Sequence, residues 1–369
     1  MGTVCRWLAA LVTLCAVSPL HGAAVGGACA GNVTDCRWRA GGGVEQPERA
    51  GACALNGTQA DCQLRGLSSV PADLPAGTRV LHLDANELGA LRGGSLGHLP
   101  RLRALHAKLC RLRALPPGLF AGLPHLGHVD LAFNLISHVE PDTFSGNPRL
   151  QTVNFAFNNL ANITSETFRH NSLLKHLDLS FNELNTLPED AFMHLPYLEQ
   201  LLLPGNGLQV LPDRLFVSNT RISFLDVSHN ALTTLGTTTF RRLKHLKVLK
   251  ASDNKLVQLQ PTLFEANFLL SEIFVHNNKL TSLSSQLLNA TQMSLLSLND
   301  NPWHCDCALK TFLEEVHSRG ASLVAATECA TPPAMAKRDV ILLFHDQIAC
   351  NTTAQQGDTS TPVIVTESQ

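Results

Sequence analysis

The stretch LGHVDLAFNLI occupies residues 126–136, and related copies follow as LQTVNFAFNNL at residues 150–160 and LKHLDLSFNEL at residues 174–184. Each copy has an asparagine in the same slot, 24 residues after the previous one. The slot recurs ten times, at Asn86, Cys110, Asn134, Asn158, Asn182, Asn206, Asn230, Asn254, Asn278 and Asn301, and only the last step is 23 residues. A fixed period over this many units indicates an internal structural repeat.

The pattern around each slot is L-x-x-L-x-L-x-x-N-x-L, which is typical of leucine-rich repeats. Its x-L-x-L-x piece predicts a short strand whose two apolar side chains point inward. One strand cannot bury that side alone, whereas stacked units share a continuous core. The asparagine amide both donates and accepts, so it can satisfy backbone groups where the strand turns away. We therefore predict an α/β leucine-rich-repeat solenoid, a horseshoe with a concave parallel β-sheet of about ten strands.

A second set of residues repeats with the same period on the opposite side of each unit. It comprises Phe120, Phe144, Phe168, Phe192, Phe216, Phe240 and Phe264, with Leu96 and Leu288 at the ends. We expect these side chains to stack as an aromatic spine in the convex half of the core. Packing alone explains the fixed period, so we favour it over a cofactor-binding interpretation.

The ends of the chain predict a secreted protein. Residues 1–24 resemble a signal peptide, because Arg6 precedes an apolar run that is too short to span a bilayer. We divide the rest into a cysteine-rich N-terminal cap at 25–77, repeats at 78–300, a cysteine-rich C-terminal cap at 301–350 and a disordered polar tail at 351–369. No other apolar stretch is long enough for a membrane anchor, so we expect an extracellular location.

Glycosylation motifs and charge agree with that compartment. N-x-S/T sequons occur at Asn32, Asn56, Asn162, Asn289 and Asn351, and none lies on an outward strand position. The formal net charge of −2 implies no nucleic-acid partner.

The cysteines form two groups of four outside the repeats. Of 11 in the sequence, Cys5 and Cys15 lie in the signal peptide and Cys110 occupies a ladder slot. We expect Cys110 to be a buried free thiol that acts as a small packing group. The others are Cys29, Cys36, Cys53 and Cys62 before the repeats, and Cys305, Cys307, Cys329 and Cys350 after them. Disulfide-bonded caps would cover the open core ends and strand edges of the array.

The cap sequences resemble those of extracellular leucine-rich-repeat proteins. Residues 62–75, CQLRGLSSVPADLP, look like the end of an N-terminal cap, and residues 301–310, NPWHCDCALK, look like a C-terminal cap. The resemblance extends to variable lymphocyte receptors, chondroadherin, the Nogo receptor and Toll-like receptor ectodomains. It implies the pairs Cys305–Cys329 and Cys307–Cys350, with Trp303 plugging the last repeat.

The N-terminal cap departs from that family pattern, because a glycine-rich stretch at residues 40–52 separates Cys36 from Cys53. The resemblance implies the crossed pairs Cys29–Cys53 and Cys36–Cys62. The local pairs Cys29–Cys36 and Cys53–Cys62 remain an alternative.

No motif predicts an enzyme, a cofactor or a metal site. GGSLG at residues 93–97 matches G-x-S-x-G, but it lies inside a repeat rather than between a strand and a helix. His304-Cys305-Asp306-Cys307 has plausible zinc ligands, although disulfides are the favoured interpretation in a secreted chain.

The outward strand positions line the concave face, where we expect a ligand. An apolar group there comprises Leu202, Phe224, Val248, Phe274 and Leu295, and a polar group comprises His82, His106, His128, Asp130, His176 and Asp178. For the polar group we favour a solvated surface over a metal site or a pH-sensitive contact. The predicted ligand contacts are His128, Asp130, His176, Asp178, Leu202, Phe224, Asp226, Lys250 and Phe274.

The sequence contains two other candidate surface features. Phe133, Phe157 and Phe181 precede ladder asparagines and are expected to stack at the rim of the sheet. The basic residues Arg241, Arg242, Lys244 and Lys247 can attract a sulfated glycosaminoglycan, although a solvated surface also accounts for them.

Taken together, the sequence predicts a secreted glycoprotein that binds a protein ligand on its concave face, as a recognition module or a soluble ligand trap. A matrix protein that binds collagen or cell receptors is the first alternative. An accessory or inhibitory subunit of a secreted enzyme is the second.

Overall fold

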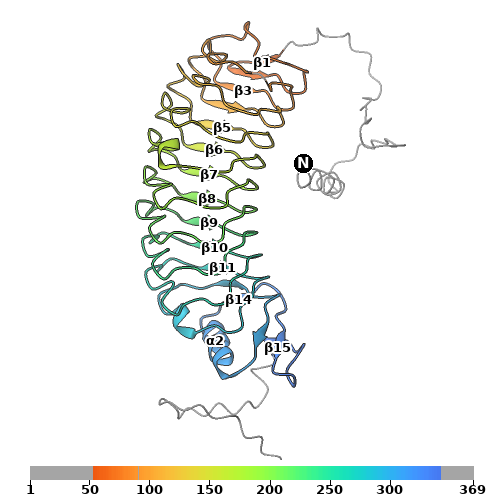
Figure 1. The fold of residues 1–369 in the computed structure, drawn as a ribbon, viewed down its shortest axis with the longest axis vertical. Coiled ribbons are helices and arrows are strands. Elements are labelled where there is room, and N and C mark those ends of the chain that lie inside the picture. The colour runs from red at the N-terminus through yellow and green to blue at the C-terminus, as the bar shows by residue number, and fades with distance from the viewer. Residues whose placement is uncertain (1–52, 90, 342–369) are drawn as a thin grey trace, which may run out of the picture. The chain divides into compact units, whose positions relative to one another are not determined.

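The repeats stack as coils, each contributing one strand to a parallel sheet (Figure 1). The computed structural model describes residues 53–89 and 91–341. The repeat strands are β3 Val80–His82, β4 Ala104–His106, β5 His128–Asp130, β6 Thr152–Asn154, β7 His176–Asp178, β8 Gln200–Leu202, β9 Phe224–Asp226, β10 Val248–Lys250, β11 Glu272–Phe274 and β12 Leu295–Ser297. Each pairs in parallel with the next, for example Val129 of β5 with Val153 of β6. The predicted solenoid and its ten repeat strands are confirmed.

The core follows the apolar pattern of the strands. Leu201 and Leu203, which flank an outward residue of β8, are both 0% exposed. Burying a leucine side chain contributes about 1.5–3 kcal/mol, and the repeat multiplies this gain along the stack. The predicted phenylalanine spine is also buried, with ring centroids 5.0 Å apart between Phe120 and Phe144 and 6.1 Å apart between Phe240 and Phe264.

The ladder asparagines connect each coil to the preceding one. Asn134 Oδ1 accepts from the backbone N–H groups of Cys110 and Leu112, both at 3.0 Å. Its Nδ2 donates to the carbonyls of Ala107 at 2.8 Å and Leu131 at 2.9 Å. Burying a polar backbone group without a partner costs about 1–3 kcal/mol, so the amide removes a large penalty at every turn.

Cys110 fills its ladder slot with fewer bonds. Its thiol is free, buried and within 3.1 Å of the carbonyl oxygen of Leu83. Burial raises the pKa of this thiol to about 11, so it stays protonated at neutral pH.

A further set of asparagines was not anticipated from the sequence. Asn147, Asn171, Asn219 and Asn267 are 0–1% exposed and lie three residues after spine phenylalanines. Asn147 Nδ2 donates to the carbonyls of Phe120 and Leu123, both at 3.0 Å. The convex turns are thus tied together by side-chain amides as well.

The N-terminal end of the sheet is covered by a hairpin of β1 Ala54–Asn56 and β2 Gln59–Asp61, with β2 parallel to β3. The hairpin places Cys53 beside Cys62, and these two cysteines are disulfide-bonded. The crossed pairs Cys29–Cys53 and Cys36–Cys62 are therefore wrong. The antiparallel register, with Ala54 opposite Asp61, brings the flanking cysteines together locally.

The C-terminal end is covered by helix α2 Cys307–Ser318, which buries Leu309, Phe312, Leu313 and Val316. Trp303 is 0% exposed and its indole N–H donates to the carbonyl of Leu298 at 2.9 Å. Cys305 is bonded to Cys329, as the resemblance implies, and Cys307 is disulfide-bonded too, so neither sulfur is a zinc ligand.

The remaining elements are short. β14 Ser322–Leu323 extends the main sheet beside β12, and the cap strands β13 Trp303–His304 and β15 Cys329–Thr331 form a separate pair. The 3₁₀ helices η1 Ser165–Phe168 and η2 Ser285–Leu288 lie in two of the segments that follow ladder asparagines.

Several predictions concern residues outside the described part of the chain. They are the signal peptide at 1–24, Cys29, Cys36, Cys350, the sequons at Asn32 and Asn351, and the tail at 351–369. Among the described residues, no helix is both long and apolar enough to cross a membrane.

Candidate ligand-binding surface

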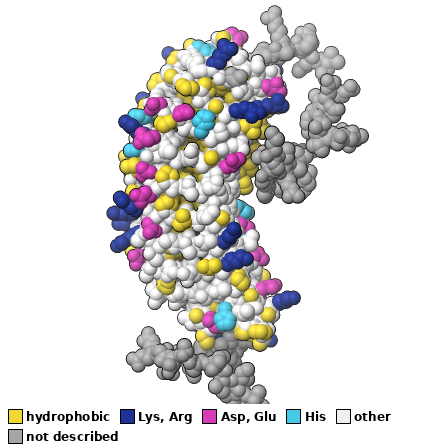
Figure 2. Space-filling model, viewed as in Figure 1, with side chains coloured by type: hydrophobic (Ala, Val, Ile, Leu, Met, Phe, Trp, Pro, Cys, Tyr) yellow, Lys and Arg dark blue, Asp and Glu magenta, His cyan; other side chains and the backbone are white. Residues whose placement is uncertain are grey.

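The side chains at the two ends of each three-residue repeat strand form what we call the sheet face. Strands typically alternate a buried central residue with half-buried flanking residues, as in Thr152–Asn154 and Val248–Lys250. All nine predicted ligand contacts lie on this face, on β5, β7, β8, β9, β10 and β11. Neighbouring strands are about 4.8 Å apart, so side chains on adjacent strands are within contact distance. In Figure 2, hydrophobic, acidic and basic side chains are interspersed over the surface in view.

Three of the predicted contacts come together around one ammonium group. Lys250 Nζ lies 5.3 Å from the ring centroid of Phe224 and 5.6 Å from that of Phe274. The register explains the cluster, because Val248 pairs with Phe224 on one side while Lys250 pairs with Phe274 on the other. No carboxylate among the described residues forms an ion pair with Lys250. We call Phe224, Lys250 and Phe274 the aromatic clamp; all three are half-buried.

The aspartates of the face have a structural role as well. Asp130, Asp178 and Asp226 accept the backbone N–H two residues ahead, at 3.2, 2.9 and 2.9 Å respectively. Asp178 also accepts the hydroxyl of Ser180. Burial raises the pKa of Asp178 and the hydrogen bonds from Ser180 oppose the shift. One oxygen of each carboxylate is thus used to hold the turn.

The histidines of the first strands form a row. The rings of His82 and His106 are stacked with centroids 4.6 Å apart, and those of His106 and His128 are 4.9 Å apart. His176 is separated from this row by Thr152, the partner of both His128 and His176. The predicted polar group is therefore divided into two parts.

Burial is the first cause of a lowered pKa at both His106 and His128. For His106 the neighbouring rings of His128 and His82 lower it further. For His128, Asp130 opposes the shift and Lys108 adds to it. Asp130 itself is paired with Lys108, at 3.1 Å from Nζ to Oδ2.

The rim of the sheet changes character along the stack. Phe133, Phe157 and Phe181 stack with centroid distances of 4.4 and 4.3 Å, as expected. The stack ends at Gly205, where an added Cβ would lie 2.3 Å from the ring of Phe181. Beyond it, the same rim position holds His229, Asp253, Asn277 and Asp300, all with positive φ.

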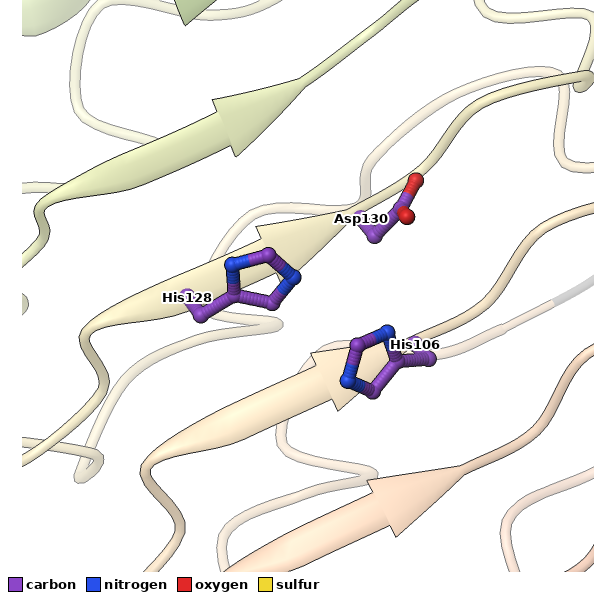
Figure 3. A group of neighbouring side chains, drawn as sticks. All are labelled: His106, His128 and Asp130. Atoms are coloured by element: carbon purple, nitrogen blue, oxygen red, sulfur yellow. The ribbon is translucent and has the colours of Figure 1, made fainter. Parts of the chain in front are cut away.

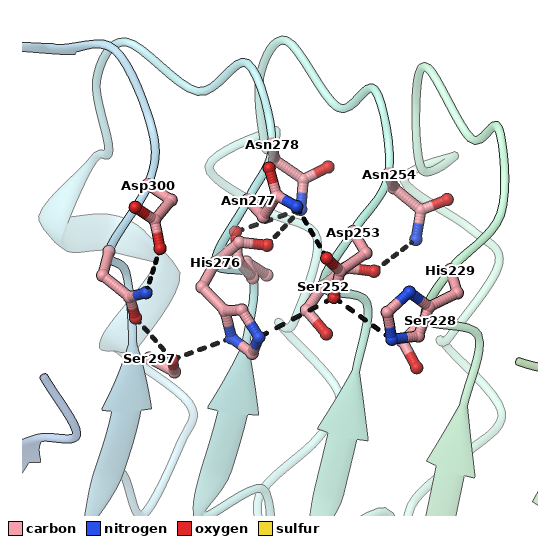
Figure 4. Close-up of polar contacts among 12 residues, drawn as sticks. Ser228, His229, Ser252, Asp253, Asn254, His276, Asn277, Asn278, Ser297 and Asp300 are labelled. Atoms are coloured by element: carbon pink, nitrogen blue, oxygen red, sulfur yellow. Dashed lines mark hydrogen bonds and ion pairs between the residues drawn. The ribbon is translucent and has the colours of Figure 1, made fainter. Parts of the chain in front are cut away.

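These polar rim residues belong to a network that the sequence analysis did not anticipate (Figure 4). Asp253 Oδ2 lies 3.4 Å from Nε2 of His229 and 3.8 Å from Nε2 of His276. His276 Nδ1 lies 2.8 Å from the hydroxyl of Ser297. A serine, a histidine and an aspartate thus meet, but Ser297 is 2% exposed and also donates to Asn299. Its oxygen is closed to a substrate, so the network ties neighbouring coils together.

Two basic groups lie outside the sheet face. Arg241, Arg242 and Lys244 line a hollow of about 630 Å³ together with Glu265 and Phe268. A second hollow of about 170 Å³ is lined by Arg79, Arg101, Arg103 and His125, which the sequence analysis overlooked. The only signal for the second group was basic residues at 24-residue spacing.

The described sequons are accessible and lie off the sheet face. Asn56, Asn162 and Asn289 are all exposed. Asn56 belongs to the N-terminal hairpin and Asn289 follows η2. Glycans at these positions would leave the sheet face open.

Comparisons with known proteins agree with the fold. Residues 108–160, 148–208 and 201–256 match the family model described as Leucine rich repeat. Leucine-rich repeat-containing protein 3 from Homo sapiens is 49% identical over 57 residues, and the protein of the same name from Rattus norvegicus is 44% identical over 57 residues. Each match covers 15% of this chain and only 20% of the relative.

Two solved structures share the architecture. The mouse RP105/MD-1 complex contains a chain with a TM-score of 0.65 and 23% identity, covering 77% of this chain and 53% of that one. An octameric complex of Latrophilin 3, Unc5D and FLRT2 (LRR) gives a TM-score of 0.62 and 22% identity, covering 78% of this chain and 96% of that one. Similarity at this level shows the fold alone.

The stacked coils and the matched repeats together show a leucine-rich-repeat solenoid fold. Solenoids of this fold typically act as protein-interaction scaffolds.

Proposed function

We propose that this chain is a secreted glycoprotein that binds an extracellular protein ligand through its sheet face. The aromatic clamp is the observation that carries the proposal. Aromatic side chains, phenylalanine included, are enriched at protein interfaces relative to the rest of the surface. Here Lys250 lies between Phe224 and Phe274. All three are outward strand residues, which alternate with the core residues of the same strands.

The clamp selects for a particular kind of contact. Attraction between an ammonium group and an aromatic ring contributes about 0.5–1 kcal/mol at exposed sites, so the rings favour one position for Lys250 Nζ. Asp226 is the register partner of Lys250, but its Oδ1 accepts from Ser228 and no ion pair forms between the two residues. The ammonium group can therefore pair with an acidic side chain of the ligand. Leu202, which lies opposite Asp226 on the strand before Phe224, adds apolar surface to the same face.

Affinity capture with variants tests the proposal. The purified protein is used to capture ligands from extracellular fluid, and the Phe224→Ala/Phe274→Ala variant should capture at least about 30-fold less of the main ligand, as for interface residues worth 2 kcal/mol. Val257→Ala is the control, because Val257 is 51% exposed and lies outside the strands. Equal capture by the wild type and the double variant would rule out the clamp as the binding site.

Secretion and glycosylation are supported by the N-terminal pattern and by the exposed sequons. Expression in cultured animal cells should release a chain that begins after residue 24 and loses mass on enzymatic removal of N-glycans. A chain retained in the cell at full length would contradict this part of the proposal.

A sulfated glycosaminoglycan is a second candidate ligand, and the hollow lined by Arg241, Arg242 and Lys244 favours it. Lys247 is exposed in the same repeat and adds positive charge. None of these four residues has an ion-pair partner among the described residues. Glu265 contributes one carboxylate to the lining. The remaining positive charge of the hollow is available to attract sulfate groups.

Heparin chromatography separates this site from the other basic group. The Arg241→Gln/Arg242→Gln/Lys244→Gln variant should elute at clearly lower salt than the wild type. The Arg79→Gln/Arg101→Gln/Arg103→Gln variant removes the same charge from the other hollow. If only this second variant weakens retention, the binding site is the N-terminal group and the proposed one is wrong.

A further inference from the structure

One group of side chains on the sheet face has the composition of a metal site. His106 lies on β4, and His128 and Asp130 lie on the adjacent strand β5 (Figure 3). One ligand atom from each of the three lies within 4.8 Å of those of the other two. Among the residues that the structure describes, no other three His, Cys, Asp or Glu side chains bring their ligand atoms so close.

The parallel register creates this group. His106 is the direct partner of Asp130 across the two strands. His128 is two residues before Asp130, so both side chains project from the same side of β5. All three are therefore presented by a rigid sheet rather than by loops, which favours precise ligand placement.

The donor set matches zinc. Two imidazole nitrogens and one carboxylate oxygen are among the ligands that Zn²⁺ takes in proteins, at bond lengths of about 2.0–2.2 Å. Tetrahedral geometry with such bonds places ligand atoms about 3.5 Å apart. Side-chain rotations that move the ligand atoms by about 1 Å would therefore close the group around an ion. Neutral imidazole is the form of histidine that binds metal.

The neighbours of the group define how an ion would bind. Asp130 Oδ1 accepts the backbone N–H of Ala132 at 3.2 Å, which leaves Oδ2 as the ligand. Oδ2 is paired with Lys108 Nζ at 3.1 Å, so the ion must displace this ammonium group. His82 stacks against His106 with centroids 4.6 Å apart and supports the orientation of that ring.

We propose that His106, His128 and Asp130 form a zinc-binding site on the sheet face, with the fourth coordination position open to water or to a side chain of a bound partner. The site does not depend on the aromatic clamp, which lies on β9, β10 and β11. A failure of the protein-ligand proposal would therefore leave the zinc site intact, and the reverse also holds.

Metal titration of the full, tag-free chain tests the site. After treatment with a chelator, Zn²⁺ is followed by calorimetry, and Co²⁺ by the visible absorption that a four-coordinate site produces. The wild type should bind one equivalent, and His106→Ala/His128→Ala should weaken binding at least about 100-fold. His176→Ala, on the same face at β7, should bind as the wild type does. Unchanged binding in the double variant, or equal loss in the His176 control, would overturn the site.

A gain-of-affinity variant keeps the test independent of folding defects. Lys108→Met removes the competing ammonium group, which is 40% exposed and screened by water, from the buried carboxylate of Asp130, so zinc affinity should rise about two- to fivefold. Unchanged zinc affinity in Lys108→Met would show that Asp130 is not a ligand, and would overturn the site as assigned.

Discussion

The two halves of the sheet face use the same backbone for different purposes. On β3 to β5, the side chains contact one another: histidine rings stack in a row, and Asp130 is paired with Lys108. On β8 to β11, Lys250 is held by two aromatic rings and has no carboxylate partner among the described residues. The side chains of the first half thus contact mainly one another, whereas the second half leaves a charge and apolar surface for another molecule. A repeat framework permits this because the outward positions do not contribute to the core.

We expect the ladder asparagines to contribute to the free energy of unfolding in both halves, and variants of these residues test this. Asn134→Ala and Asn230→Ala should each lower the free energy of unfolding by about 3 kcal/mol, because buried backbone groups lose their partners. Asn134 should be the more costly, because it accepts from two backbone N–H groups while Asn230 Oδ1 accepts from Leu208. Urea denaturation followed by circular dichroism provides the measurement. A loss below about 1 kcal/mol in only one half would show that the halves differ in their frameworks too.

A substitution at Gly205, at the boundary between the halves, tests the close packing of the rim. Gly205→Ala should cost about 2 kcal/mol, because the new Cβ would force Phe181 away from Phe157 and Gly205 has φ of +68°. Gly122→Ala is the matched control, with φ of +76° and nothing within 4 Å of the added Cβ. Its cost should be about 1 kcal/mol, from backbone strain alone. Equal melting temperatures for the two variants would argue against a tight contact at the rim.

The weakest ladder position lies in the first half, and completing it should stabilise the protein. Cys110→Asn supplies an amide where the thiol makes only weak contacts with the carbonyls of Leu83 and Lys108. Two or three ordinary hydrogen bonds should replace them, for a gain of about 1 kcal/mol in denaturant titration. In the wild type, a thiol with a pKa of about 11 should resist iodoacetamide until the chain is unfolded. Rapid alkylation of the folded protein would contradict the buried placement.

The smallest effect concerns pH and Asp178, between the two halves. Its pKa in the folded state is raised above the ordinary value of 3.8. The folded chain therefore binds more protons than the unfolded chain as pH rises through this range, and stability falls until the folded group has ionised. Asp178→Asn retains the acceptor for Ser180, as Asn154 does for Ala156, and should be at least as stable at pH 7. Thermal denaturation of the variant and the wild type provides the measurement. If their melting temperatures differ by the same amount at pH 3 and at pH 7, the pKa of Asp178 is not raised in the folded state.

The sequence predicted the framework well because its signals are periodic. Each predicted strand coincides with an observed one, and the phenylalanine spine is buried where the 24-residue period placed it. The second set of asparagines escaped notice because the same slot holds leucine in other repeats, at Leu123, Leu195 and Leu243, all buried. The crossed cap disulfides were wrong because a family resemblance outweighed the local hairpin between Cys53 and Cys62.

The surface was only partly predictable. The sequence placed Phe224 and Phe274 in one apolar group and made Lys250 a predicted ligand contact. It did not indicate that both rings lie around one ammonium group. Arg79, Arg101 and Arg103 do not form a continuous run, and they share a hollow with His125 only because successive coils are stacked.

The sequence by itself determined the stack of coils, because burial of leucine and phenylalanine at a fixed period leaves one efficient packing of the units. It also determined which side chains would face outward, since side chains alternate along a strand. The tertiary structure decided which of these outward side chains touch. Those contacts join residues 22–26 positions apart, across strands spaced by about 4.8 Å, and depend on register and side-chain rotamers that no local pattern encodes.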